Sequence, residues 1–165
     1  MVVAFAFMAE TSRRRFLKRV IAGAGVATGP AVEAQSTGVR AFDHVALPMQ
    51  NVEAMVAFYR ALGFDVEENP QVCVAHFGTQ MINFHRPALW QRENFTLRAP
   101  KAAPPCGDLC FVWEGTAAAL KAALDRIPVK VEEGPVNRQG GRRTNGSSTY
   151  VRDPDGNLLE FIIYS

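Results

Sequence analysis

The fold is decided by a stretch that reads FDHVALPMQNVEAMVAFYRALGF from Phe42 to Phe64. Its first part, residues 42–48, is mostly apolar and ends at a proline, which is typical of a short strand. After Asn51 the apolar residues recur at helical spacing, and Gly63 stands where a glycine commonly ends a helix. We therefore predict a strand followed directly by a helix that Asn51 caps.

The rest of the chain repeats this order. Three short strands are expected after the first helix, at residues 64–68, 71–77 and 80–85. A second set comprises a strand, a helix capped by Thr116 and three more strands, at residues 107–113, 116–127, 129–133, 148–152 and 157–164. The predicted fold class is α+β, with two βαβββ modules at about residues 40–86 and 106–165 and a connector at 87–105. Because a helix covers one face of each sheet, the other faces of these curled mixed sheets are free to line a cleft.

Charge is concentrated at the start of the chain. The first 34 residues hold five Lys/Arg and two acids, which leaves 13 basic and 14 acidic residues elsewhere. The later part is near neutral, so composition gives no reason to expect nucleic acid or a membrane surface as a partner. Residues 12–18 read SRRRFLK and resemble the twin-arginine export signal, and a glycine-containing apolar run and Val32-Glu33-Ala34 follow. We predict a signal peptide over 1–34, a domain over 35–165 and a periplasmic location.

Three cysteines lie within the predicted domain: Cys73, Cys106 and Cys110. No C-x-x-C pair occurs, which argues against a structural zinc site. A disulfide between Cys106 and Cys110 is one interpretation. The other, which we prefer, makes Cys73 and Cys110 small apolar core residues.

Three segments of the predicted domain resemble the vicinal-oxygen-chelate superfamily, which contains glyoxalase I, extradiol dioxygenases and bleomycin-binding proteins. They are FDHV at residues 42–45, AFYRALGF at 57–64 and DPDGNLLE at 153–160. The overall pattern is most similar to small glyoxalase-like members. The resemblance implies a cleft between the sheets, a divalent metal at the first and last strands of the modules, and pairing into a homodimer.

Four positions match the ligand positions of metal-using members, namely His44, Asn83, Asp108 and Glu160. The resemblance implies His44, Asp108 and Glu160 as metal ligands, with Mn, Fe, Ni, Zn or Mg as the metal. The chain departs from the family at two of these positions, where Asn83 replaces a glutamate and Asp108 replaces a histidine. The resulting ligand set is richer in oxygen donors, which are hard ligands. His85 lies two residues beyond Asn83 and shares its strand face, so it is a candidate ligand in its place or an acid/base group. Glu160 is the second catalytic candidate.

Structural roles stay open for the same residues. His44 could be a histidine bonded to a backbone carbonyl, Glu160 could pair with an arginine, and Asp108 could cap the bend before it. The segment DPDG at residues 153–156 is a turn under either interpretation.

Substrate-binding candidates come from two other segments. A loop predicted over residues 137–147 carries Arg142 and Arg143 among glycines, and is either a lid that pairs with an anionic group or a solvated loop. In the connector, Trp90 is a candidate wall of the cleft.

Two functions follow from these features. The first is an exported metal-dependent enzyme, of isomerase, lyase or dioxygenase type, acting on a small molecule with vicinal oxygens. The alternative is a metal-free protein that sequesters a small toxic or antibiotic ligand.

Overall fold

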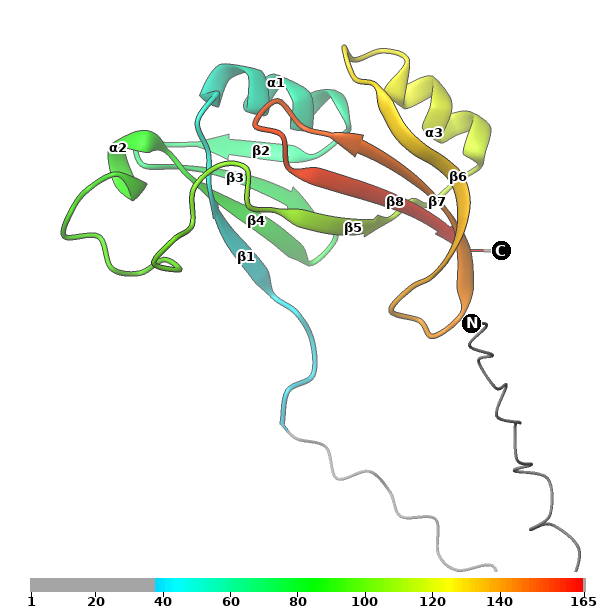
Figure 1. Cartoon of the computed structure of the whole chain (residues 1–165), viewed down its shortest axis with the longest axis horizontal. Helices are drawn as coiled ribbons and strands as arrows, with labels where there is room; N and C mark the ends of the chain where they lie inside the picture. Colours follow the sequence, from blue (N-terminus) through cyan, green and yellow to red (C-terminus); the bar gives the residue numbers. More distant parts are fainter. Residues whose placement is uncertain (1–37, 165) are drawn as a thin grey trace, which may run out of the picture. The chain divides into compact units, whose positions relative to one another are not determined.

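The structure is a computed structural model and describes residues 38–164 of the chain (Figure 1). The predicted signal peptide over 1–34 lies outside the described residues. The chain divides after Arg40, and the unit from Ala41 onward holds all the elements discussed below. Within residues 38–164, no helix is long and apolar enough to span a bilayer.

Two successive βαβββ modules build this unit, as predicted. The first contains β1 (His44–Pro48), α1 (Val52–Ala61), β2 (Asp65–Glu68), β3 (Val72–Phe77) and β4 (Gln80–His85). The connector holds a single helical turn, α2 (Pro87–Trp90). The second contains β5 (Asp108–Val112), α3 (Ala117–Leu124), β6 (Val131–Gln139), β7 (Asn145–Arg152) and β8 (Leu158–Tyr164). The strand orders are β1-β4-β3-β2 and β5-β8-β7-β6, each with one parallel and two antiparallel pairs, so the α+β fold class is confirmed.

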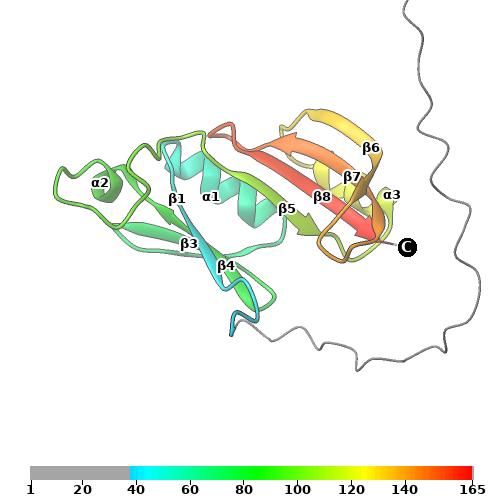
Figure 2. The same ribbon diagram turned by 60° about the horizontal axis from the view of Figure 1, so that its bottom comes forward.

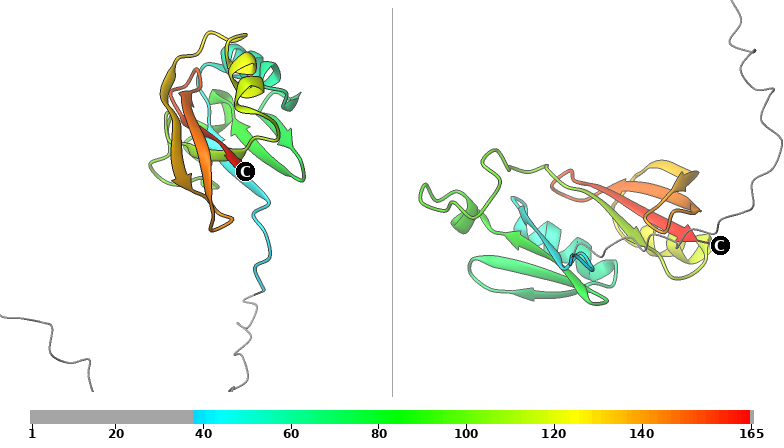
Figure 3. Two further views of the ribbon diagram at one scale, coloured as in Figure 1. Left: turned by 90° about the vertical axis from the view of Figure 1, so that its right-hand side faces the viewer. Right: turned by 90° about the horizontal axis from the view of Figure 1, so that it is seen from below.

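The two longer helices, α1 and α3, cover the same side of the unit. Figure 1 shows α1 and α3 above the sheets, and in Figure 2, with the bottom turned forward, the strands lie in front of the helices. The two views of Figure 3 agree with this arrangement. Each sheet therefore keeps one face that none of the helices within residues 38–164 covers.

The helix-covered faces share one core. Met55, Val56, Phe58 and Tyr59 of α1 are buried because they recur on one side of the helix. Aromatic rings join the modules. The ring of Phe111 in β5 makes edge-to-face contacts with two rings of the first module, and its centroid lies 5.3 Å from that of Phe64 and 5.1 Å from that of Phe77. These contacts fix the two sheets relative to each other.

The DPDG turn does more than reverse the chain. Its Asp155 carboxylate accepts hydrogen bonds from the backbone N–H groups of Gln50 (2.7 Å) and Asn51 (2.8 Å), at the start of α1. Asp153 of the same turn accepts a hydrogen bond from the buried hydroxyl of Tyr59 at 3.1 Å. The turn thus ties the end of the second module to the helix of the first.

The predicted capping residues differ in outcome. Thr116 caps α3, accepting a hydrogen bond from the backbone N–H of Ala119 at 3.1 Å, as predicted. The side chain of Asn51 makes no capping bond; it donates instead to Pro154 and Asp155. Asn51 thus occupies the N-cap position of α1, as predicted, but the carboxylate of Asp155 and not the Asn51 side chain accepts from the backbone N–H groups there.

The loop predicted over residues 137–147 is mostly a hairpin. Strand β6 continues to Gln139 and β7 begins at Asn145, so only residues 140–144 form the tip. The prediction of a loop over 137–147 rested on composition rich in Gly, Arg and Asn, and it was wrong at both ends because β6 continues past Gly134 and Pro135. The ladder passes them with register shifts between Val131 and Val136.

The cysteines are all free. Cys73 is buried in the core, as predicted, whereas Cys110 is exposed on the helix-free face of β5. The prediction of a core position for Cys110 was therefore wrong, because its strand face has no helix above it.

Candidate functional site

Glu160 lies at the centre of a polar cluster on the helix-free face of the second sheet. In the strand register, Glu160 of β8 stands beside Cys110 of β5 on one side and Tyr150 of β7 on the other. Paired residues of neighbouring strands point to the same face. Ser148 and Asp108 share this face because they lie two residues along their strands from Tyr150 and Cys110. We call these five residues the Glu160 cluster.

Glu160 is half-buried and is held by a hydroxyl group. Ser148, which is fully buried, donates a hydrogen bond from its Oγ to Glu160 Oε1 at 2.5 Å. Hydrogen bonds to a carboxylate are generally stronger than those between neutral groups. The Glu160 side chain is therefore fixed in position rather than free to rotate.

The other neighbours of Glu160 keep their protons. Burial, followed by the nearby Glu160, raises the pKa of Cys110 from 9.0 to about 12. Burial and the Glu160 charge also raise the pKa of Tyr150, although Arg138 acts against the shift. In the cluster, a neutral thiol and two hydroxyl groups thus lie beside the carboxyl groups of Glu160 and Asp108 and can donate hydrogen bonds to them or to a ligand.

A basic residue borders the cluster. The Arg138 guanidinium lies over the Tyr150 ring, 5.7 Å from its centroid, and pairs with Glu133 at 2.9 Å. Sequence reasoning missed Ser148, Cys110 and Tyr150 as site residues, and placed Arg138 in the predicted 137–147 loop together with Arg142 and Arg143. The period-two alternation on each strand was available, but the pairing register that gathers them around Glu160 was not.

On the first sheet, the predicted residues are more dispersed. His44 begins β1, with its side chain 47% exposed, and its Nδ1 lies 2.7 Å from Asp43 Oδ1. Asn83 stands opposite Ala46, and its buried Oδ1 has no hydrogen-bond partner. His85 is buried at the end of β4 with its ring edge-on to Phe95, and burial lowers its pKa.

Imidazole and carboxylate groups are suitable donors for a divalent metal, but one chain does not bring them together. Among residues 38–164, no three His, Cys, Asp or Glu side chains form a group that could hold a metal ion. Asp108 and Glu160 belong to the second sheet, whereas His44 belongs to the first. The assignment of these three residues as ligands stays a prediction.

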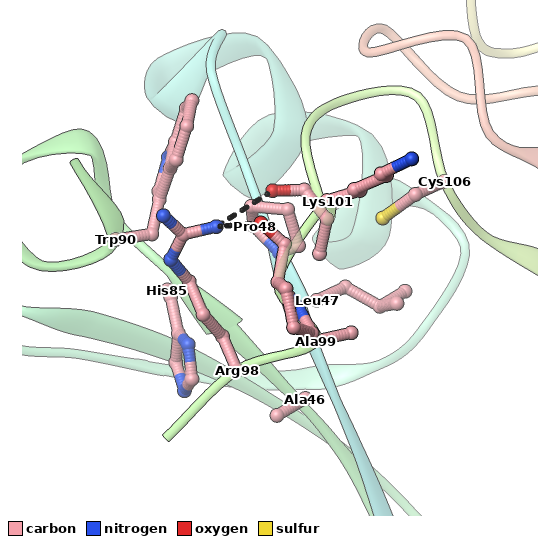
Figure 4. Close-up of a pocket in the computed structure, with 11 residues that line it drawn as sticks. Ala46, Leu47, Pro48, His85, Trp90, Arg98, Ala99, Lys101 and Cys106 are labelled. Carbon is pink, nitrogen blue, oxygen red and sulfur yellow. Dashed lines mark hydrogen bonds between the residues drawn. The ribbon is translucent and has the colours of Figure 1, made fainter. Parts of the chain in front are cut away.

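The predicted substrate-binding residues occupy two different places. Arg142 and Arg143 form the tip of the β6–β7 hairpin, where the Arg142 guanidinium lies 4.7 Å from the Tyr164 ring centroid. Trp90 lines a cavity between the connector and the first sheet that includes neither arginine (Figure 4). Their role in substrate binding also stays a prediction.

Two βαβββ modules, each with a sheet face that carries polar residues and no helix, define one class of proteins that share this architecture. The chain belongs to the Glyoxalase/Bleomycin resistance protein/Dioxygenase superfamily, whose family model matches residues 41–161. That superfamily includes lyases, isomerases and dioxygenases, its enzymes commonly use divalent metals, and its members are often dimers.

Two relatives are identical to this chain at about a third of the aligned residues. "Glyoxalase domain-containing protein RDO1" of Mycosarcoma maydis is 34% identical over 141 residues, which is 85% of this chain and 77% of the relative. "Virulence protein STM3117" of Salmonella typhimurium is 32% identical over 126 residues, 74% of this chain and 83% of the relative. The crystal structure of the latter has a TM-score of 0.68, covering 77% of this chain and 98% of that one.

A more distant structure shows the fold alone. Lactoylglutathione lyase from Agrobacterium tumefaciens has a TM-score of 0.57 at 23% identity, covering 76% of this chain and 95% of that one.

Proposed function

We propose that the protein is a metal-dependent enzyme acting on a small molecule with vicinal oxygens, and that Glu160 is its catalytic acid/base. The observation that carries this proposal is the position of Glu160: a half-buried carboxylate, fixed by Ser148, on a sheet face that no helix covers. A carboxylate held in this way can accept a proton from a bound substrate and return it at another atom.

The proposed site forms between two copies of the chain. Each copy has two helix-free faces, one carrying His44 and the other carrying Asp108 and Glu160. In a two-fold homodimer, the first sheet of each copy can face the second sheet of the other copy, which gives two equivalent sites. In this arrangement His44 of one copy and Asp108 and Glu160 of the other would hold the divalent metal. When bound, the metal polarises substrate oxygens and stabilises the negative charge that develops on them.

The remaining cluster residues have supporting roles in the proposal. Ser148 keeps Glu160 in one orientation, and the neutral hydroxyl of Tyr150 can donate a hydrogen bond to a substrate oxygen. Arg142 and Arg143 at the hairpin tip bind an anionic part of the substrate. His85 is the second acid/base candidate, since burial favours its neutral form, which can accept a proton.

Metal analysis of the purified protein tests the proposal. We expect near-stoichiometric Mn, Fe, Ni, Zn or Mg by mass spectrometry, lost in His44→Ala and in Glu160→Gln. A matched control is Glu133→Gln, which changes the charge by the same amount at a residue that pairs with Arg138 on the same sheet. If the wild-type protein takes up none of these metals under any loading condition, the metal-dependent proposal is wrong.

The alternative function is a metal-free binding protein that sequesters a small toxic or antibiotic ligand. It is favoured by one observation: within residues 38–164 of a single chain, no His, Cys, Asp and Glu side chains form a metal-holding group. A chain that stays metal-free yet protects cells against such a ligand, without converting it, would support this alternative.

We also propose export to the periplasm, which rests on the SRRRFLK sequence at residues 12–18. Fractionation of cells that make the full chain tests it. We expect Arg13→Lys combined with Arg14→Lys to leave the protein in the cytoplasm, while the control Arg19→Lys is exported normally. Equal distribution of the two variants would contradict export by this route.

A further inference from the structure

The second feature that points to a ligand is the cavity beneath the connector, which has a volume of about 570 Å³. Its walls come from β1, the end of β4, α2 and the connector (Figure 4). This volume is typical of sites for small organic molecules. The cavity does not include any residue of the Glu160 cluster, so it is a separate place in the chain.

Most of the cavity wall is apolar. Leu47, Pro48 and the alanines of the connector line it together with the indole of Trp90. Trp90 donates its Nε1 proton to the Met49 carbonyl at 2.9 Å, so its polar edge is already satisfied and its ring is held in place. A fixed aromatic ring beside aliphatic side chains favours a flat, apolar ligand body.

The cavity also contains positive charge that the protein does not neutralise. Arg98 and Lys101 both line it, and within residues 38–164 neither forms an ion pair with a carboxylate.

The hydrogen bonds of Arg98 are also incomplete. Its Nε is buried without a hydrogen-bond partner, and its Nη1 reaches only the carbonyls of Pro100 and Ala102, at 3.4 Å each. Figure 4 draws these two contacts as dashed lines. A guanidinium beside apolar walls normally has a carboxylate or phosphate partner, because desolvating an unpaired charge is costly.

We propose that this cavity binds a small aromatic carboxylate, with its carboxylate group at Arg98 and Lys101 and its ring against Trp90. The carboxylate supplies both the missing acceptor and the missing negative charge. The connector that carries both cations is a proline-bearing loop, which can adjust to the ligand more easily than a strand. The proposal does not depend on the metal-dependent function, because Arg98 and Lys101 have no part in that function. Of the residues given a role there, His85, the second acid/base candidate, also lines this cavity.

Benzoate is the probe for this site, with benzamide as its uncharged analogue. Trp113→Phe leaves Trp90 as the single tryptophan of the full chain, so fluorescence reports on the cavity itself. We expect saturable benzoate binding that changes Trp90 fluorescence and raises the Tm, and binding of benzamide at least tenfold weaker. Absence of saturable benzoate binding, or equal binding of benzamide, would overturn the proposal.

Charge variants identify the binding residue. We expect Arg98→Gln to weaken benzoate binding at least tenfold and Lys101→Gln to weaken it less, with both variants checked for folding by their Tm. The control Arg92→Gln removes an exposed arginine of the same connector, whose Nε donates to the Ala88 carbonyl, and should bind benzoate normally. If Arg98→Gln fails to fold, Lys101→Gln decides: normal benzoate affinity in this variant overturns the two-cation site.

A last variant separates this proposal from the previous one. Glu160→Gln should lose metal yet bind benzoate as the wild-type chain does. Loss of benzoate binding in Glu160→Gln would mean that the two sites are one, and would contradict a separate carboxylate site.

Discussion

At the scale of single residues, Cys110 shows how one carboxylate controls its neighbour. Cys110 is an exposed residue that a reagent can reach, yet partial desolvation of its thiol, followed by the nearby Glu160, raises its pKa to about 12. A thiol must lose its proton to react. A shift from 9.0 to about 12 lowers the thiolate fraction on the order of a thousandfold at pH 8.

We therefore predict that iodoacetamide labels Cys110 at pH 8 far more slowly than an unperturbed thiol, as measured by mass spectrometry of the labelled peptide. Glu160→Gln should speed up the labelling, since it removes the negative charge beside the sulfur. The control is Glu133→Gln, which should leave the rate unchanged. Rapid labelling of Cys110 in the wild-type chain would contradict the description of the cluster.

His85 gives a prediction about stability and pH. Burial lowers the folded-state pKa of His85 below its usual 6.5, so the unfolded chain binds a proton more readily than the folded one. The stability contributed by neutral His85 is thus present above pH 6.5 and is lost as pH falls through its lowered folded-state pKa.

Urea unfolding from pH 7.5 down to pH 5 measures this loss. We expect His85→Gln to flatten the pH dependence, because glutamine does not titrate. His76→Gln is the control, since His76 is less buried and lies toward the other end of the same sheet. The same slope in His85→Gln as in the wild type would mean that another group is responsible.

At the scale of elements, the DPDG turn is the contact that orders the two modules. Asp155 accepts hydrogen bonds from two backbone N–H groups and from the Asn51 side chain, all before α1 begins. Asn157 accepts two more from Cys106 and Gly107, where β5 begins. One turn therefore fixes the entry of a helix in one module and of a strand in the other.

We predict that Asp155→Ala lowers the free energy of unfolding by about 3 kcal/mol, because three partly buried, charge-assisted hydrogen bonds are lost together. Asp125→Ala is the matched control. Its carboxylate makes only an exposed pair with Lys121 at 2.7 Å, which is expected to contribute about 0.5 kcal/mol. Equal losses in the two variants, measured by urea unfolding, would show that the turn does not join the modules.

At the scale of the whole molecule, the sequence predicted the architecture better than the site. The apolar patterns of residues 42–64 and their repeat later in the chain were enough for two βαβββ modules, because local periodicity determines strands and helices. Local periodicity does not predict which distant segments contact each other. The bonds from Asn51 to Asp155 and from Ser148 to Glu160 depend on tertiary packing and strand register, which a single sequence does not reveal.

The same limit applies to the predicted metal ligands. The match to the family's motifs identified His44, Asp108 and Glu160 individually, but it carried no information on which sheet faces meet. Residues 38–164 of one chain place them on two separate sheets and do not gather them into a metal-holding group, which is why the proposed site combines two copies. This combination makes the dimer the element of the proposed function that can be tested most directly.

Co-expression of two inactive variants tests it. His44→Ala and Glu160→Gln each disrupt every site of their own homodimer, if each site combines His44 of one copy with Glu160 of the other. In the mixed dimer, one site carries both substitutions and the other carries neither. Random pairing should therefore restore metal to about a quarter of the wild-type sites, since half of the dimers are mixed and one of their two sites is intact.

The measurement is the metal content of co-expressed protein, with each variant expressed alone as the baseline and its dimeric state checked by light scattering. A site formed within one chain predicts no recovery, because every chain then carries a defect in its own site. Recovery near a quarter supports the shared site, and recovery of none in a confirmed mixed dimer rules it out.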